Sequence, residues 1–375
     1  MLLYIHVPFC RSKCRYCSFF SRPFDMVAVE AYVSALLAEM RHWGRKLSRP
    51  AVETVYFGGG TPSLLPSWAL SRIMPELRRQ FDLDGVVEWT FEANPDSALD
   101  GGYLASLLRY GVNRLSLGVQ SLSDADLRAL GRPHTAVQAT AAYQLARQAG
   151  FANIGLDLIW GLPGQRETGW LEQLRAVVAL RPEHLSCYGL TVEAGTPLAA
   201  DVEEGGVILP PEGEQGRMYV HGAEFLEAAG YLQYEISNFA RMGFVSRHNS
   251  GYWEGKDYLG LGPAAVSTLG GVRHENPADL AQWGALVRAG RCGQGGAALT
   301  DAEKAREMVM LALRTTRGLP LAAYRKATGR DFIRDNAALV TALRQNDLIR
   351  ISAGHLRLTK NGFLVSNVIL ERLSY

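Results

Sequence analysis

Three cysteines lie close together near the start of the chain, at Cys10, Cys14 and Cys17. Thiolate sulfur is a soft ligand, so three thiolates on one short loop are typical of an iron–sulfur cluster or a zinc site. A structural zinc ion normally has four protein ligands, and the best local candidate for a fourth, His6, would point from within a predicted strand. Three ligands leave one corner of a cluster free. The spacing therefore favours a cluster, with zinc and unliganded cysteines as the alternatives.

Further polar residues follow the ends of successive predicted strands. The loop Gly58-Gly59-Gly60-Thr61-Pro62 comes after the second strand, Glu92 and Gln120 end the next two, and Asp157 lies in the fifth, while Arg132 follows on a loop. Glycines allow a ligand to approach the backbone, although a tight turn is the alternative. Each polar residue taken singly could also be a helix cap or part of a salt bridge. Because barrel sites are built at the carboxyl ends of strands, their convergence favours a ligand site.

The elements that position these residues alternate between short apolar runs and stretches of helical period. That alternation predicts an α/β fold with a parallel sheet. Apolar residues from Val29 to Met40 recur with the spacing of one helix face. Between an open sheet and a partial (β/α)6 barrel, which share this repeat, we predict the partial barrel. The six expected strands are Leu2–Pro8, Thr54–Phe57, Glu88–Glu92, Arg114–Val119, Ile154–Trp160 and His184–Leu190.

The chain is expected to contain three parts. Residues 1–190 form the barrel, and residues 191–296, rich in Gly, Pro and aromatic residues, extend the sheet and cover one mouth of the barrel. Residues 297–375 form a separate winged-helix-like domain. It begins with a capping box at Thr300 and Glu303 and contains three short helices, two strands and a final helix.

Composition limits the classes of partner. The chain of 375 residues is 47% hydrophobic with a formal net charge of +2, which predicts a folded protein without strong global attraction to nucleic acid. Residues 297–375 are basic, with 13 cations and 7 anions. Their candidate recognition helix, near Asp335–Asn346, contains only Arg344 as a cation. We therefore expect no nucleic-acid partner.

The cellular location follows from the N-terminus and the cysteines. The opening MLLYIHVPFC lacks a cationic start and a cleavage site, so we expect no signal peptide. No apolar run is long enough for a transmembrane segment, although transient membrane association stays open. A reducing compartment would keep the cysteines available as thiolates. A cytoplasmic protein is the expectation.

These residues carry a resemblance to a known family. The Cys10-x3-Cys14-x2-Cys17 motif with the loop 58–62 resembles the radical SAM superfamily. More narrowly, the chain is similar to the oxygen-independent coproporphyrinogen dehydrogenase group and to the related HemW-type haem chaperones. The segments that carry this likeness are Tyr4-Ile-His6-Val-Pro-Phe-Cys10, Gly-Val-Gln120, Arg132 and Asp157-Leu-Ile-Trp-Gly-Leu-Pro.

The resemblance implies a [4Fe–4S] cluster whose fourth iron is chelated by S-adenosylmethionine. The reduced cluster would donate one electron and split the sulfonium to a 5′-deoxyadenosyl radical. The implied S-adenosylmethionine contacts are Tyr4, Tyr16, Gly59, Gly60, Thr61, Glu92, Gln120, Arg132 and Asp157. Such chemistry also implies an electron donor such as flavodoxin or ferredoxin.

Three features make the chain resemble the chaperones more than the dehydrogenase. The dehydrogenase has another cysteine two residues after the third, where this chain has Phe19, and it also has a long segment ahead of the cluster. His248-Asn-Ser-Gly-Tyr252-Trp253 resembles the HNxxYW motif of the chaperones. Where many relatives have Gly-Ala-His, however, this chain has Ala264-Ala265-Val266.

The HNxxYW-like motif implies haem as a third ligand. The His248 imidazole could ligate haem iron, and Tyr252 and Trp253 offer flat apolar surface to a porphyrin. An ordinary hydrogen-bonded histidine is the alternative. The expected function is therefore a haem chaperone that delivers haem to an acceptor protein. The alternative is a coproporphyrinogen III dehydrogenase, which decarboxylates its substrate oxidatively, or another radical SAM enzyme of tetrapyrrole metabolism.

Overall fold

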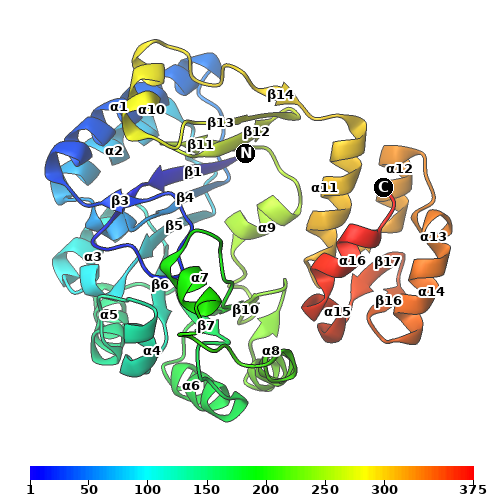
Figure 1. Ribbon diagram of the computed structural model, residues 1–375. Coiled ribbons are helices and arrows are strands. Elements are labelled where there is room, and N and C mark those ends of the chain that lie inside the picture. The colour runs from blue at the N-terminus through cyan, green and yellow to red at the C-terminus, as the bar shows by residue number, and fades with distance from the viewer.

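A computed structural model describes residues 1–375. Its main feature is a twelve-stranded sheet with six parallel strands in sequence order at the centre (Figure 1). These strands are β1 (Leu2–Val7), β4 (Thr54–Gly59), β5 (Glu88–Ala93), β6 (Arg114–Gln120), β7 (Ile154–Trp160) and β8 (His184–Gly189). The predicted partial (β/α)6 barrel is confirmed. Each predicted strand agrees with the observed one to within two residues at either end.

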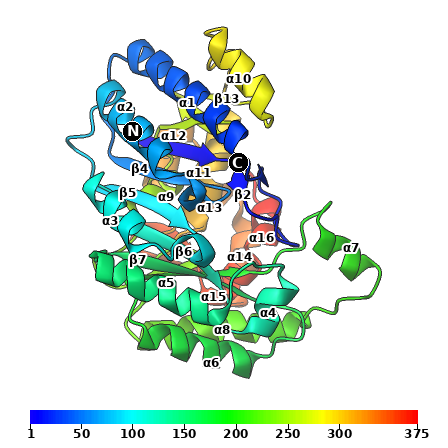
Figure 2. The same ribbon diagram turned by 90° about the vertical axis from the view of Figure 1, so that its left-hand side faces the viewer.

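Helices cover the outer face of this sheet (Figures 1 and 2). They are α1 (Met26–Lys46), α2 (Ser67–Gln80), α3 (Gly101–Arg109), α4 (Asp124–Ala129), α5 (Ala136–Ala149), α6 (Glu167–Ala179) and α8 (Glu212–Ala228). The apolar stripe predicted between Val29 and Met40 is buried on α1. Helix α5 ends at Gly150, whose φ of 108° is readily adopted by glycine. Short 3-10 turns lie at Pro62–Leu64 and Pro95–Ser97.

The segment after β8 extends the sheet at both edges. At one edge β11 (Tyr258–Leu261) pairs in parallel with β1 and is followed by antiparallel β12 (Val266–Leu269), β13 (Val272–Glu275) and β14 (Ala297–Ala298). At the other, β10 (Asn238–Ala240) joins β8, and β9 (Leu232–Gln233) joins β10. Strand β14 continues the main sheet two residues past the expected boundary at residue 296. This segment also contains α7 (Pro197–Glu203), α9 (Arg247–Trp253) and α10 (Leu280–Arg288).

The C-terminal region has its own hydrophobic core, which extends from Ala305 to Leu373 and includes Tyr219 of α8. The capping box predicted at Thr300 and Glu303 is present. The region contains four helices before its hairpin, rather than three, because Asn336 interrupts the helical path between α13 and α14. Similarly, Val365 divides the expected final helix into two.

The elements of this region are α11 (Asp301–Leu313), β15 (Leu319–Pro320), α12 (Leu321–Thr328), α13 (Phe332–Asp335), α14 (Ala337–Gln345), β16 (Ile349–Ser352), β17 (His355–Leu358), α15 (Lys360–Leu364) and α16 (Ser366–Arg372). The three strands form one small sheet with β17 in the middle. In the chain as a whole, no helix combines the length and apolar character needed to cross a membrane.

Candidate cofactor site

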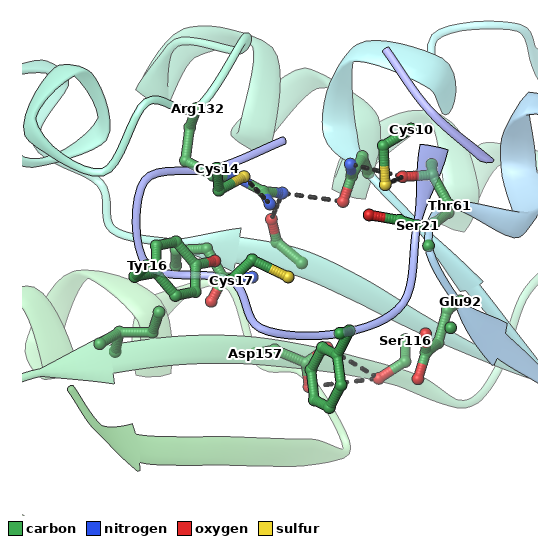
Figure 3. Close-up of a pocket in the computed structure, with 18 of the residues that line it drawn as sticks. Cys10, Cys14, Tyr16, Cys17, Ser21, Thr61, Glu92, Ser116, Arg132 and Asp157 are labelled. Carbon is green, nitrogen blue, oxygen red and sulfur yellow. Dashed lines mark hydrogen bonds between the residues drawn. The ribbon is translucent and has the colours of Figure 1, made fainter. Parts of the chain in front are cut away.

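The three cysteines lie on a loop that crosses the carboxyl ends of the barrel strands (Figure 3). We call residues 10–23 the cysteine loop. Its base is closed by pairing between β2 (Phe9–Cys10) and β3 (Arg22–Pro23). Farther along, the Arg15 N–H donates to the carbonyl of Leu130 at 3.1 Å. Backbone pairing thus holds the loop over the barrel while the sulfurs of the cysteines point toward a common space (Figure 3).

A cavity of about 440 Å³ lies between the cysteine loop and the strands, and all three cysteines line it. Eight of the nine residues expected to contact S-adenosylmethionine also line it, namely Tyr16, Gly59, Gly60, Thr61, Glu92, Gln120, Arg132 and Asp157. Tyr4 does not line the cavity, and its hydroxyl is 3.1 Å from Nδ1 of His6. The parallel topology therefore gathers residues that are up to 147 positions apart in the sequence.

Two cysteine sulfurs receive hydrogen bonds from residues of the barrel. The Thr61 hydroxyl donates to Sγ of Cys10 at 3.6 Å, and Arg132 donates to Sγ of Cys14 at 3.4 Å. Arg132 also donates to Oδ1 of Asn94 and to the carbonyl of Gly118, both at 2.8 Å. These partners orient the guanidinium toward the sulfur of Cys14. A cation in this position can donate a charge-assisted hydrogen bond to a metal-bound thiolate.

Two partly buried carboxyl groups form the opposite wall. Oε1 of Glu92 accepts a hydrogen bond from the Tyr56 hydroxyl at 2.6 Å. Burial raises the pKa of Glu92 to about 7, against the opposing effect of the Tyr56 hydrogen bond. Burial also raises the pKa of Asp157, which accepts hydrogen bonds from Ser186 at 2.6 Å and Ser116 at 3.2 Å. Desolvated carboxyl groups of this kind gain most from a cationic ligand, because its charge favours their ionised form.

Gln120 reaches the cavity through an irregular strand end. Its φ is 65°, in the left-handed region, and the register between β6 and β7 shifts between Leu117 and Gln120. A non-glycine residue in this region costs of order 1–3 kcal/mol and persists only where the surroundings impose it. The irregularity lies at the end of β6 where Gln120 lines the cavity.

The glycines at positions 58–60 were expected from the sequence to let a ligand approach the backbone. In the structure, atoms of the protein itself occupy the space that a side chain would need at each position. A Cβ at Gly60 would lie 2.6 Å from the carbonyl oxygen of Phe9, and one at Gly59 would lie 2.6 Å from the His6 ring. A Cβ at Gly58 would lie 2.9 Å from the Tyr56 ring. The close approach that excludes a side chain is thus made by the protein itself. Substitution of Gly60 would displace β1 and the cysteine loop, so it cannot test ligand binding alone.

Several cavity residues were not predicted, including Tyr56, Asn94, Arg114, Ser116 and Ser186. Alternation along the strands was an available signal. Side chains two or four residues apart on a strand point to the same face. By this rule Ser116 would be expected beside Gln120, and Asn94 beside Glu92. The hydrogen bond from Ser186 to Asp157 had no comparable local signal, because it joins two strands.

The HNxxYW-like motif lies on α9, with its histidine buried and its Tyr252 and Trp253 partly exposed. The His248 side chain is 1% exposed, and its Nδ1 is 2.8 Å from the Thr54 hydroxyl. Its ring stacks on Tyr56 with centroids 4.9 Å apart and contacts the Tyr252 ring edge-on. Burial lowers the pKa of His248 to about 3, so the imidazole is neutral. The cavity is lined by Asn249 of this motif but not by His248, Tyr252 or Trp253.

Comparison with known proteins defines the class first. The profile of the radical SAM superfamily matches residues 4–176, and that of the HemN C-terminal domain matches residues 299–365. In structure, the chain is similar to coproporphyrinogen III oxidase (HemN) from Escherichia coli, a radical SAM enzyme. That similarity has a TM-score of 0.84 and 26% identity, and it covers 99% of this chain and 89% of the other. The fold is that of a radical SAM protein.

Sequence similarity then narrows the class. The haem chaperone HemW of Bacillus subtilis is 34% identical over 98% of this chain and 97% of its own length. That of Mycobacterium tuberculosis is 36% identical over 99% of this chain and 94% of its own. A mouse protein, radical S-adenosyl methionine domain-containing protein 1, mitochondrial, is 41% identical over 70% of this chain and 59% of its own length. The chain belongs to the HemW family of radical SAM proteins.

Proposed function

We propose that this protein is a haem chaperone that binds a [4Fe–4S] cluster and S-adenosylmethionine and delivers haem to an acceptor protein. The main support is similarity to named haem chaperones along nearly the whole chain. Phe19, which takes the place of the dehydrogenase's further cysteine, adds to this support. Its side chain is 69% exposed at the rim of the cavity. A cytoplasmic location remains a prediction from the sequence.

The donor set of the cavity fits the cluster. In a cubane each cysteine binds a different iron, so the thiolates need only surround a common space. A single ion would require all its ligands to converge on one point, and no three His, Cys, Asp or Glu side chains do so here. Cys10, Cys14 and Cys17 would hold the cluster. When bound and reduced, it supplies an electron for cleavage of a sulfonium.

The other cavity residues fit S-adenosylmethionine by charge. Arg132 can donate a charge-assisted hydrogen bond to its carboxylate. Gln120 and Asp157 can accept hydrogen bonds from ribose hydroxyls or the ammonium group. Glu92 places a further carboxylate near the cationic ligand. Tyr16, Gly59, Gly60 and Thr61 complete the proposed contacts, whereas Tyr4 would act behind the wall of the cavity.

The cysteine loop also supports an electron donor as a partner. Residues 10–23 include the exposed cations Arg11, Lys13, Arg15 and Arg22 and no Asp or Glu. Arg11 pairs with Asp96 and Arg15 with Asp201, so Lys13 and Arg22 carry most of the unneutralised positive charge. An acidic protein such as flavodoxin or ferredoxin would be attracted to this surface, beside the proposed cluster. This attraction would weaken as salt concentration rises.

Haem is the proposed cargo. The predicted contact through His248, Tyr252 and Trp253 requires α9 to leave its position, because His248 is only 1% exposed. Anaerobic titration of the cluster-loaded protein with hemin tests the function. A shifted Soret band with a defined stoichiometry is expected. The absence of a specific shift would contradict the proposal.

A coproporphyrinogen III dehydrogenase is the second candidate, favoured by the structural similarity to HemN. An anaerobic assay with coproporphyrinogen, a reductant and S-adenosylmethionine separates the two functions. Decarboxylated product formed together with 5′-deoxyadenosine would support the dehydrogenase. We expect no decarboxylated product.

A further inference from the structure

Helix α9 lies at the floor of the barrel, where β5 anchors it. The Glu88 carboxylate accepts hydrogen bonds from the Arg247 N–H at 2.8 Å, the His248 N–H at 3.0 Å and the Ser246 hydroxyl at 3.2 Å. Glu88 is 4% exposed. Glu92 lies four residues farther along the same strand, hence on the same face. On this face of β5, Glu88 therefore anchors α9 and Glu92 lines the cavity.

A chain of contacts joins His248 to the cavity. Thr54 and Tyr56 lie on the same face of β4, two residues apart. The Thr54 hydroxyl is 2.8 Å from Nδ1 of His248, and the imidazole stacks on the Tyr56 ring at 4.9 Å with an interplanar angle of 29°. The hydroxyl of Tyr56 in turn donates to Glu92 at 2.6 Å. The imidazole thus restricts the plane of the tyrosine ring, which sets the direction of the phenolic O–H.

We infer that His248 is a positioning residue of the S-adenosylmethionine site, acting through Tyr56 on Glu92. This inference rests on the proposed binding of S-adenosylmethionine in the cavity. Without the imidazole, the Tyr56 ring has room to turn, and Glu92 loses a hydrogen bond that holds its carboxylate toward the ligand. Asn249, the next residue of α9, lines the cavity itself, so the helix reaches the site at two adjacent positions.

The test is equilibrium binding of S-adenosylmethionine to cluster-reconstituted full-length protein. His248→Ala and Tyr56→Phe should each weaken binding by about tenfold, the loss expected for one positioned hydrogen bond to a carboxylate. The double variant should be no weaker than either single one, because both changes interrupt one path. His248→Phe keeps an aromatic ring against Tyr56 and should restore most of the affinity lost in His248→Ala.

A matched control separates positioning from general loss of packing. His274 is also buried and ring-stacked, with centroids 5.2 Å from Trp43, but it lies on β13 and does not line the cavity. His274→Ala should leave the affinity unchanged at equal cluster content. Wild-type affinity in both His248→Ala and Tyr56→Phe would overturn the inference, as would additive losses in the double variant.

A different result would contradict the proposed function itself, independently of the role of His248. If the cluster-loaded wild-type protein does not bind S-adenosylmethionine at all, the cavity assignment is wrong, whatever the variants do. Hemin titration of the same variants adds an independent readout. An altered Soret band in His248→Ala with unchanged S-adenosylmethionine affinity would favour haem ligation and overturn the positioning role.

Discussion

The cysteine loop and helix α9 both carry a motif of cofactor-binding residue types, but they are built in opposite ways. The loop borders a cavity, and the sulfurs of Cys10 and Cys14 each receive a single hydrogen bond from the barrel. Helix α9 is anchored by three hydrogen bonds to Glu88, and His248 is enclosed by Thr54 and two tyrosine rings. A site for an external ligand needs space beside its donors. The loop has that space, whereas α9 in this position does not.

The largest expected effect comes from the loop. Replacing any of Cys10, Cys14 or Cys17 with Ala should abolish cluster formation, because only three thiolates are available to hold it. Wild-type protein reconstituted anaerobically should contain four irons and four sulfides per chain, measured by iron and sulfide analysis. Cys292→Ala is the control, since that buried cysteine lies outside the cavity. A stable zinc site with no reconstituted cluster would contradict the assignment.

The second prediction concerns the hydrogen bonds from the start of α9 to Glu88. Glu88→Ala leaves three donors near the start of α9 without their acceptor, so the free energy of unfolding should fall by about 3 kcal/mol. Chemical denaturation measures it, and Glu53→Ala, which removes an exposed pair with Lys256, should cost no more than about 1 kcal/mol. If haem binds through His248, hemin affinity should rise in the Glu88 variant. Unchanged stability would show that α9 is not anchored as described.

The third prediction concerns the guanidinium that connects loop and barrel. Arg132→Ala should weaken S-adenosylmethionine binding by about 10- to 100-fold, because charge-assisted hydrogen bonds each contribute about 1.5–3 kcal/mol. Binding is compared at equal cluster content. Arg128→Ala, on the short helix α4 and outside the cavity lining, is the matched control. Equal affinity in the two variants would show that Arg132 does not contribute to S-adenosylmethionine binding.

The smallest effect is a pH dependence. Since the pKa of Glu92 is raised to about 7, the carboxyl group is mostly protonated at pH 6 and mostly ionised at pH 8. A cationic ligand favours the ionised form, so S-adenosylmethionine affinity should increase across this range, by up to about tenfold. Glu92→Gln should bind more weakly and lose this dependence. Retention of the same pH profile in Glu92→Gln would assign the titration to another group.

Much of the barrel and its cavity was predictable because the signals are local or periodic. Strand periodicity, the spacing of Cys10, Cys14 and Cys17, and the polar residues at strand ends predicted a ligand site at one edge of the sheet. Eight of the nine ligand contacts that the family resemblance implied line one cavity there. Their convergence follows from parallel topology, which brings the carboxyl ends of all strands to one edge. The exception is Tyr4, which lies inside β1. Its hydroxyl is within hydrogen-bond distance of the His6 ring and not in the cavity.

The sequence alone was enough to predict the chemistry of the ligand donors, the positions of the strands and the protein family, because these depend on residue type and spacing. The position of α9 in the barrel floor was not accessible in that way. It depends on Glu88, 160 residues before His248 in the sequence, and on packing between β4 and the imidazole. The atom that requires a glycine at position 60, the carbonyl oxygen of Phe9, also comes from a distant part of the chain, 51 residues earlier. Such contacts arise only when the chain closes on itself, so a motif can identify a histidine without showing what surrounds it.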